Sequence, residues 1–212
     1  MRRVRIKFCG ITRPEDAHAA VALGADAIGL VLTRKSIRFP GVEHARAIRA
    51  ALPPFVAAVA LFLDDTPEWI AQAIAAVGPD LLQFHGNEDA AACARFGLPY
   101  LKAIPMAGGG DVAAAMAAHP QARGFLLDSH APGEGGGRGV TFDWSRVPAA
   151  LPRPWILAGG LTCDNVATAV RTVRPYAVDV SSGVESAPGI KDPEKMRRFV
   201  AEVARACSEI ED

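Results

Sequence analysis

Eight short apolar runs recur along this chain, and their alternation with helical segments limits the fold more than any other feature of the sequence. Each run is too short for a helix of its own and suits a strand buried in a parallel sheet. The predicted strands span residues 4–9, 26–32, 55–62, 80–85, 99–104, 124–128, 155–158 and 176–180.

The segments between these runs carry the start and stop signals of helices. The first opens at Pro14, with acidic residues behind it, and stops at Gly24. The third opens at Thr66 and Pro67 and stops at Gly78. Helices are predicted over residues 14–23, 42–51, 66–77, 88–96, 111–118, 142–149, 163–173 and 192–208.

Eight strand–helix units without a linker predict a single α/β domain over residues 1–212, folded as a closed (β/α)₈ TIM barrel. An open doubly wound sheet remains an alternative, because the count includes some short strands. No Gly-x-Gly-x-x-Gly motif follows a strand and opens a helix, which disfavours a dinucleotide-binding version of that sheet.

The net charge and the cysteines indicate which kinds of partner and which compartment to expect. The 23 Lys and Arg residues balance 23 Asp and Glu residues, so no global positive field attracts nucleic acid or an anionic membrane. A small-molecule ligand is therefore expected. The four cysteines form no Cys-x-x-Cys pair or Cys/His cluster, which indicates the reducing cytoplasm. Neither a signal-peptide core nor a membrane-length apolar run is present, so a soluble, unprocessed protein is expected.

Cys9 ends the first predicted strand and is a candidate reactive group. The strand alternates apolar and basic residues, so Cys9 shares a face with Lys7. A nearby cation favours the thiolate, the form of cysteine that can accept a proton. A buried cysteine that packs as a small hydrophobe is the alternative, and this stretch alone leaves both interpretations open.

The active site of a (β/α)₈ barrel lies at the C-terminal ends of its strands, where this chain has several polar residues. Besides Cys9, they include Gln83 and His85 on one face of the fourth strand, Asp128 and Asp179. Such a set is suited to acid–base chemistry.

Two turns rich in Gly and Ser follow the seventh and eighth strands, where barrels of this kind commonly hold a phosphate. Glycine permits close backbone approach, and backbone amides favour an anion. The predicted phosphate-binding residues are Gly159, Gly160, Ser181, Ser182 and Gly183. Two ordinary tight turns would give the same pattern.

Seven segments in chain order resemble the motifs of the phosphoribosylanthranilate isomerase family of tryptophan biosynthesis. They are Lys7-Phe8-Cys9-Gly10-Ile11-Thr12, Lys35-Ser36-Ile37-Arg38, Gln83-Phe84-His85-Gly86, Leu127-Asp128-Ser129, Phe142-Asp143-Trp144, Ala158-Gly159-Gly160-Leu161, and Asp179-Val180-Ser181-Ser182-Gly183-Val184-Glu185 with Pro188-Gly189-Ile190-Lys191-Asp192 behind it. Each motif is weak alone, but seven in order at the predicted rim are specific.

The resemblance implies a barrel of the ribulose-phosphate-binding type and an Amadori rearrangement of N-(5-phosphoribosyl)anthranilate to the ribulose 5-phosphate aminoketone. It implies that Cys9 is the general base and Asp128 the general acid, with no metal or organic cofactor. These roles lead us to expect that burial raises the pKa of Asp128 and that Lys7 lowers the pKa of Cys9.

The same resemblance assigns Arg38 to the anthranilate carboxylate, which a guanidinium can bind in a bidentate manner. His85, Gln83 and Asp179 are expected to bind the substrate, with Asp179 orienting ribose hydroxyls or holding a serine. The family has proline where Ile37 stands, which makes the placement of Arg38 less certain.

The glycine-rich segment 129–139 matches a family loop that can close over a ligand, except that Arg138 stands where the family has threonine. Plain flexibility would give the same composition. Two rival functions remain: the related isomerase of histidine biosynthesis, which uses two aspartates, and an inactive phosphosugar-binding barrel. The sequence leaves open whether the protein is a monomer or a homodimer.

Overall fold

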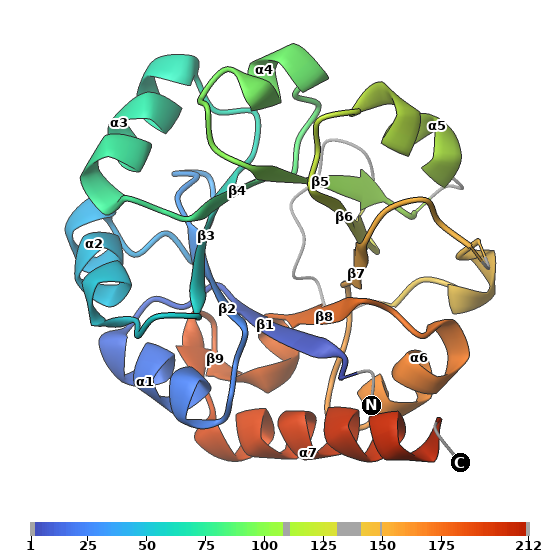
Figure 1. Ribbon diagram of the computed structural model, residues 1–212. Coiled ribbons are helices and arrows are strands. Elements are labelled where there is room, and N and C mark those ends of the chain that lie inside the picture. Colours follow the sequence, from blue (N-terminus) through green and yellow to red (C-terminus); the bar gives the residue numbers. More distant parts are fainter. Residues whose placement is uncertain (1–2, 108–110, 131–140, 149, 211–212) are drawn as a thin grey trace.

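A closed barrel of eight parallel strands forms the centre of the computed structural model, which describes residues 3–107, 111–130, 141–148 and 150–210 (Figure 1). Each strand pairs with its neighbours in the sequence, and β1 pairs with β8 to close the barrel. The strands are β1 Arg5–Cys9, β2 Ala27–Val31, β3 Ala57–Phe62, β4 Leu81–Phe84, β5 Tyr100–Pro105, β6 Gly124–Asp128, β7 Trp155–Leu157 and β8 Ala177–Val180. The predicted barrel is confirmed, and the open sheet is excluded.

Helices form a ring outside the barrel (Figure 1). They are α1 Pro14–Ala22, α2 Val42–Ala51, α3 Pro67–Val77, α4 Ala90–Ala94, α5 Val112–Ala118, α6 Val166–Val173 and α7 Pro193–Glu209. Sequence signals set several of their ends: Thr66 accepts a hydrogen bond from the Trp69 amide, and Gly78 adopts the left-handed conformation that ends α3. Within the described residues, no helix combines the length and the apolar character needed to cross a membrane.

The main core lies between the barrel and this ring of helices. Side chains on the outer face of the strands, such as Phe8, Phe62 and Phe84, are fully buried there. The inner face is different, because it carries Lys7 and Asp179 among its buried residues. The barrel therefore has an apolar outer layer that stabilises it and a partly polar interior.

Two segments differ from the sequence prediction. The helix expected over residues 142–149 is only a 3₁₀ turn, η1 Trp144–Arg146, since Pro148 keeps Val147 extended and cannot donate to a helix. A hairpin of β9 Glu185–Ala187 and β10 Ile190–Lys191 follows a 3₁₀ turn, η2 Ser182–Val184, after β8. Strands this short carry no readable periodicity.

Replacing Phe84 by Ala should destabilise the barrel strongly. The Phe84 ring is fully buried, with ring centroids of Phe62, Phe96 and Tyr100 between 5.9 and 6.3 Å away. We expect a loss of about 3 to 5 kcal/mol in the free energy of unfolding, measured by denaturant titration. Ile37→Ala is the matched control because Ile37 is exposed; equal losses in the two variants would contradict this prediction.

Candidate active site

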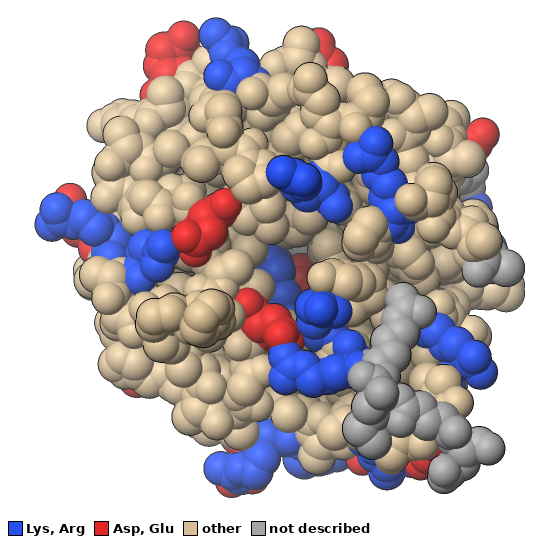
Figure 2. Space-filling view, viewed as in Figure 1, with Lys and Arg blue, Asp and Glu red and all other residues tan. Residues whose placement is uncertain are grey.

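A cavity of about 560 Å³ opens at the C-terminal ends of the strands. In Figure 2 this face is hollowed near its centre, with acidic and basic side chains inside. The cavity brings together every residue that the sequence nominated for the site, namely Cys9, Arg38, Gln83, His85, Asp128, Gly159, Gly160, Asp179, Ser181, Ser182 and Gly183.

Cys9 lies beside a buried ion pair. Lys7 Nζ donates to both carboxylate oxygens of Asp179 at 2.9 Å, and the two residues are Cα partners on β1 and β8. Burial raises the pKa of Asp179 and would lower that of Lys7, but two equal short contacts are those of an ionised pair. Asp179 is thus held by Lys7. Gly29 leaves room for the thiol, because a Cβ there would lie 2.7 Å from Cys9 Sγ.

The expectation that the pKa of Cys9 is lowered is wrong for this structure. Burial is the largest influence and raises the pKa of the thiol. The Lys7 ammonium opposes that rise, but the Asp179 carboxylate cancels part of its effect. Sequence reasoning identified the cation and missed the anion that neutralises it.

Asp128 lies at the end of a chain of buried polar groups. Gln83 Nε2 is 3.1 Å from His85 Nδ1, and His85 Nε2 is 3.2 Å from Asp128 Oδ2. With the amide placed so, Gln83 donates to Nδ1, and the Nε2–H of a neutral His85 donates to Asp128. The backbone N–H of His130 donates to Asp128 Oδ1 at 3.3 Å, and its Nδ1 is 3.6 Å from that oxygen.

The expectation that burial raises the pKa of Asp128 is also wrong. Burial acts in that direction, but the imidazoles of His130 and His85 outweigh it and hold the pKa well below its usual range. His130 was missed by sequence reasoning. The sequence did offer one signal: His130 stands two residues after Asp128, and such residues lie on the same side of an extended chain, so contact between them could have been predicted.

His85, Asp128 and His130 also form a group whose donor atoms lie within 4.8 Å of one another, the one such group among the described residues. Two imidazoles and a carboxylate are a possible donor set for a divalent ion. The contacts among Gln83, His85 and Asp128 account for the arrangement without an ion, so a metal-free site stays our prediction.

The two Gly- and Ser-rich turns lie side by side. Gly159 and Gly160 have φ values of 81° and 62°, a conformation that favours glycine. A Cβ on Gly183 would overlap the carbonyl oxygen of Leu161, so the turn after β8 packs directly against the turn after β7. Backbone and serine hydroxyls in these turns are therefore accessible to an anion such as phosphate.

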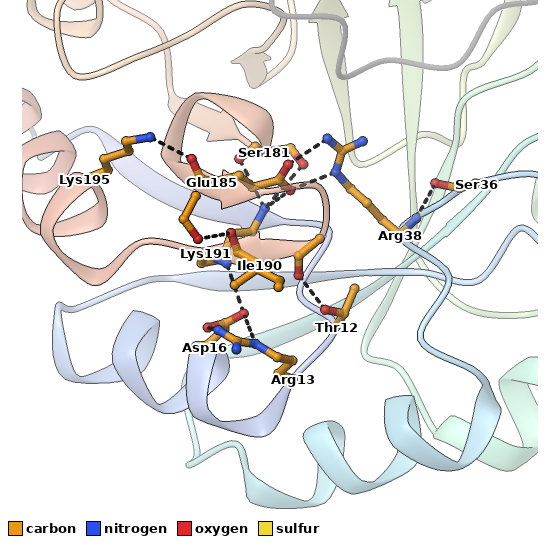
Figure 3. Close-up of polar contacts among 12 residues, drawn as sticks. Thr12, Arg13, Asp16, Ser36, Arg38, Ser181, Glu185, Ile190, Lys191 and Lys195 are labelled. Carbon is orange, nitrogen blue, oxygen red and sulfur yellow. Dashed lines mark hydrogen bonds and ion pairs between the residues drawn. The ribbon is translucent and has the colours of Figure 1, made fainter.

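Arg38 reaches the cavity rim from the loop after β2 and is held there by Glu185 (Figure 3). Its Nε and Nη2 donate to the two Glu185 oxygens at 2.8 Å each. Lys191 Nζ donates to the same carboxylate, also at 2.8 Å. Glu185 and Lys191 occurred in the quoted motifs, but the sequence assigned them no role. The closing loop expected over 129–139, with Arg138, falls mostly in segment 131–140, outside the described residues.

Comparison with known proteins decides the family. A sequence model described as N-(5'phosphoribosyl)anthranilate (PRA) isomerase matches residues 6–202. The chain belongs to this family. It is 56% identical over 206 residues to the N-(5'-phosphoribosyl)anthranilate isomerase of Pseudomonas fluorescens, covering 97% of this chain and 98% of the relative. The Halorhodospira halophila isomerase is 55% identical, with 96% and 98% of the two chains covered.

Solved structures agree. The phosphoribosyl anthranilate isomerase of Thermus thermophilus superposes with a TM-score of 0.84 at 41% identity, covering 95% of this chain and 99% of that one. An isomerase solved with reduced 1-(o-carboxyphenylamino)-1-deoxyribulose 5-phosphate gives a TM-score of 0.80 at 36% identity, with 95% and 99% covered. The protein is thus an isomerase of tryptophan biosynthesis, as the motifs implied.

Replacing Asp179 by Asn should make Cys9 more reactive toward iodoacetamide near neutral pH. In the wild type the raised pKa keeps the thiol protonated until the pH passes the ordinary value of 9.0. Asn removes an anion and leaves the Lys7 ammonium, which favours the thiolate. The measurement is the pH dependence of alkylation at the Cys9 peptide, followed by mass spectrometry.

Lys7→Met is the matched variant for this experiment, since losing the cation should slow alkylation at the same pH. A Cys9 that reacts no faster in the Asp179→Asn protein than in the wild type would contradict this electrostatic account.

Proposed function

We propose that the protein converts N-(5'-phosphoribosyl)anthranilate into 1-(2-carboxyphenylamino)-1-deoxyribulose 5-phosphate, with Cys9 as the general base and Asp128 as the general acid. The observation that carries the proposal is one cavity that holds a thiol on β1 and a carboxyl on β6, together with a guanidinium and two turns suited to an anion. An acid, a base and two anion sites are what this substrate requires.

The reaction is an Amadori rearrangement. The acid protonates the furanose ring oxygen, and the ring opens to an iminium ion. The base then removes the proton from C2, which gives an enolamine that tautomerises to the ketone. Because the iminium is the electron sink, the reaction needs no metal and no organic cofactor.

The proton for the ring oxygen comes from Asp128 and His85 acting as a pair. His85 Nε2 lies 3.2 Å from Asp128 Oδ2, so a proton can pass between the imidazole and the carboxylate along this hydrogen bond, and the imidazole is neutral or protonated according to where the proton lies. A lowered pKa of Asp128 means that its carboxyl is ionised in the free protein. Gln83 suits both forms: its amide nitrogen donates to a neutral Nδ1, and its Oε1, buried without a described partner, accepts from Nδ1–H after an amide flip.

Cys9 must lose its proton to solvent before it acts, and the proton that it then takes from C2 restores the thiol. The Lys7 ammonium favours the thiolate, and an iminium ion formed in the cavity adds a second positive charge near the sulfur. Cys9 therefore becomes an effective base once the furanose ring of the substrate has opened. In the free protein the thiol stays protonated, which also limits its oxidation.

Substrate binding is divided among the remaining residues. Arg38 pairs with the anthranilate carboxylate, and Gly159, Gly160, Ser181, Ser182 and Gly183 bind the phosphate. Gln83, His85 and Asp179 also line the cavity. Gln83 contacts His85, which contacts Asp128, and Asp179 contacts Lys7 beside Cys9. These three residues therefore orient the catalytic groups and set the charge around them.

The remaining partners follow from the same reasoning. The ligand is a small phosphorylated molecule, and the neutral net charge argues against nucleic acid or a membrane surface as a partner. The unclustered cysteines favour the reducing cytoplasm, and the enzyme acts as a monomer or a homodimer. A related Thermotoga maritima structure is described as a monomer generated from a dimeric phosphoribosylanthranilate isomerase. The fold therefore accommodates both oligomeric states.

Substituting Cys9 by Ser, or Asp128 by Asn, should lower kcat by about 10²-fold or more while the affinity for the reduced product analogue changes little. Each change removes a proton-transfer group and keeps the shape of the cavity. Steady-state fluorescence, which follows loss of phosphoribosylanthranilate, gives kcat, and calorimetry gives the affinity. Near-normal turnover in either variant would refute its assigned role.

Growth provides an independent test of the function itself. The gene should restore growth without tryptophan in a bacterial strain that lacks this isomerase. A variant carrying both Cys9→Ser and Asp128→Asn, expressed at the same level, is the control and should fail. Good expression of the wild-type chain without growth would refute the proposed activity and favour a barrel that only binds a phosphosugar.

A further inference from the structure

Arg38, Glu185 and Lys191 form a buried cluster of charges at the edge of the cavity (Figure 3). The Glu185 carboxylate lies between the two cations, and the exposed fractions of the three side chains are 13%, 6% and 0% in the order Arg, Glu, Lys. Burying three charged groups is costly, and even a well-paired buried cluster adds little to the free energy of unfolding. Stability alone therefore does not explain why these three charges lie here.

The pairing occupies one edge of the Arg38 guanidinium. A guanidinium presents five N–H donors in a planar fork, and Glu185 takes one from Nε and one from Nη2. The edge formed by Nη1 and the second N–H of Nη2 remains, and no described residue accepts from Nη1. Arg38 lines the cavity, so a second carboxylate can bind this remaining edge in the same bidentate manner.

The loop that carries Arg38 does little to fix the guanidinium. Lys35 anchors the loop through Nζ to the carbonyl oxygens of Leu63 and Asp64, and Ser36 accepts from the Arg38 amide. These contacts hold the backbone. The side chain extends past Gly10, where a Cβ would lie 2.5 Å from Arg38 Cδ. Its tip therefore depends on Glu185.

Glu185, in contrast, is itself fixed. Lys191 Nζ donates to its carboxylate and to Ser181, and Lys195 Nζ donates to its backbone carbonyl at 2.7 Å. The Lys191 amide donates to Asp16 on α1, which secures the hairpin against the barrel. Burial would raise the pKa of Glu185, but hydrogen bonds from Arg38 and Lys191 outweigh burial and lower it. Glu185 is thus an anion at neutral pH.

We propose that Glu185 is a positioning residue that holds Arg38 with its remaining edge toward the cavity, and that it thereby sets the preference for a substrate whose aromatic ring carries a carboxylate. This inference rests on the proposed function. Lys191 supplies the second positive charge beside Glu185, and Arg38 is the member of the cluster that lines the cavity.

The test compares two ligands that differ only in the carboxylate. One is reduced 1-(o-carboxyphenylamino)-1-deoxyribulose 5-phosphate, and the other is the same compound built on aniline. The wild type should prefer the first. Glu185→Gln should reduce the preference for the carboxylate ligand, given as the ratio of the two affinities, about tenfold. The amide of Gln has one acceptor oxygen, so it cannot accept from both Nε and Nη2 of Arg38.

Kinetics separate positioning from a general structural effect. Glu185→Gln should raise KM for phosphoribosylanthranilate and leave kcat within about threefold, since uniform binding is lost and the acid and base remain. Asp80→Asn is the control: Asp80 pairs with Arg49 and accepts from the Ala58 amide at the N-terminal ends of the strands, opposite the cavity, and its loss should leave the ligand ratio unchanged.

Two further variants keep the proposal testable if Glu185→Gln does not fold. Glu185→Asp keeps the charge but shortens the side chain, and it should lose part of the preference. In an Arg38→Ala background, adding Glu185→Asp should have no further effect on the ligand ratio, because Glu185 acts through Arg38.

Equal weakening of both ligands, or an unchanged ratio in the Glu185 variants, would overturn the inference. A wild-type protein that is inactive toward phosphoribosylanthranilate would refute the proposed function instead. The two failures are therefore distinguishable.

Discussion

The pairing of β1 with β8 is the constraint on which the whole site depends. It closes the barrel, and its register makes Lys7 the Cα partner of Asp179 inside a water-poor interior. An unpaired ammonium there would be strongly disfavoured, so the Asp179 carboxylate is required to keep it charged. The thiol of Cys9 consequently faces a neutral pair rather than a bare cation. The same closure that builds the site thus keeps the Cys9 thiol protonated in the free protein.

Closure also brings the C-terminal part of the chain against its N-terminal loops. The turns and the hairpin that follow β8 meet the loops that follow β1 and β2, where Glu185 contacts Arg38 and Thr12 donates to the carbonyl of Gly189. The two Gly- and Ser-rich turns pack directly on each other through Gly183 and Leu161. These turns and the loops that follow β1 and β2 therefore form one connected rim around the cavity.

Local patterns predicted most of the fold and the membership of the site. Strands and helices were readable because periodicity, proline starts and glycine stops act over a few residues. The errors lie where local signals are weak or compete: Pro148 reduces an expected helix to one turn, and the hairpin after Glu185 is too short to show a period. His130 escaped notice because its importance comes from contact with Asp128, and the motif did not include it.

The sequence by itself determined the barrel, the family and eleven of the residues that line the cavity, because strand ends in a parallel barrel converge at one face. Tertiary structure alone decided the protonation of those groups and the direction in which their side chains point. Lys7 and Asp179 are 172 positions apart, and Arg38 and Glu185 are 147 apart. A pKa depends on burial and on partners at a few ångströms, and neither can be read along the chain. For that reason both pKa expectations were wrong although the nominated residues do line one cavity.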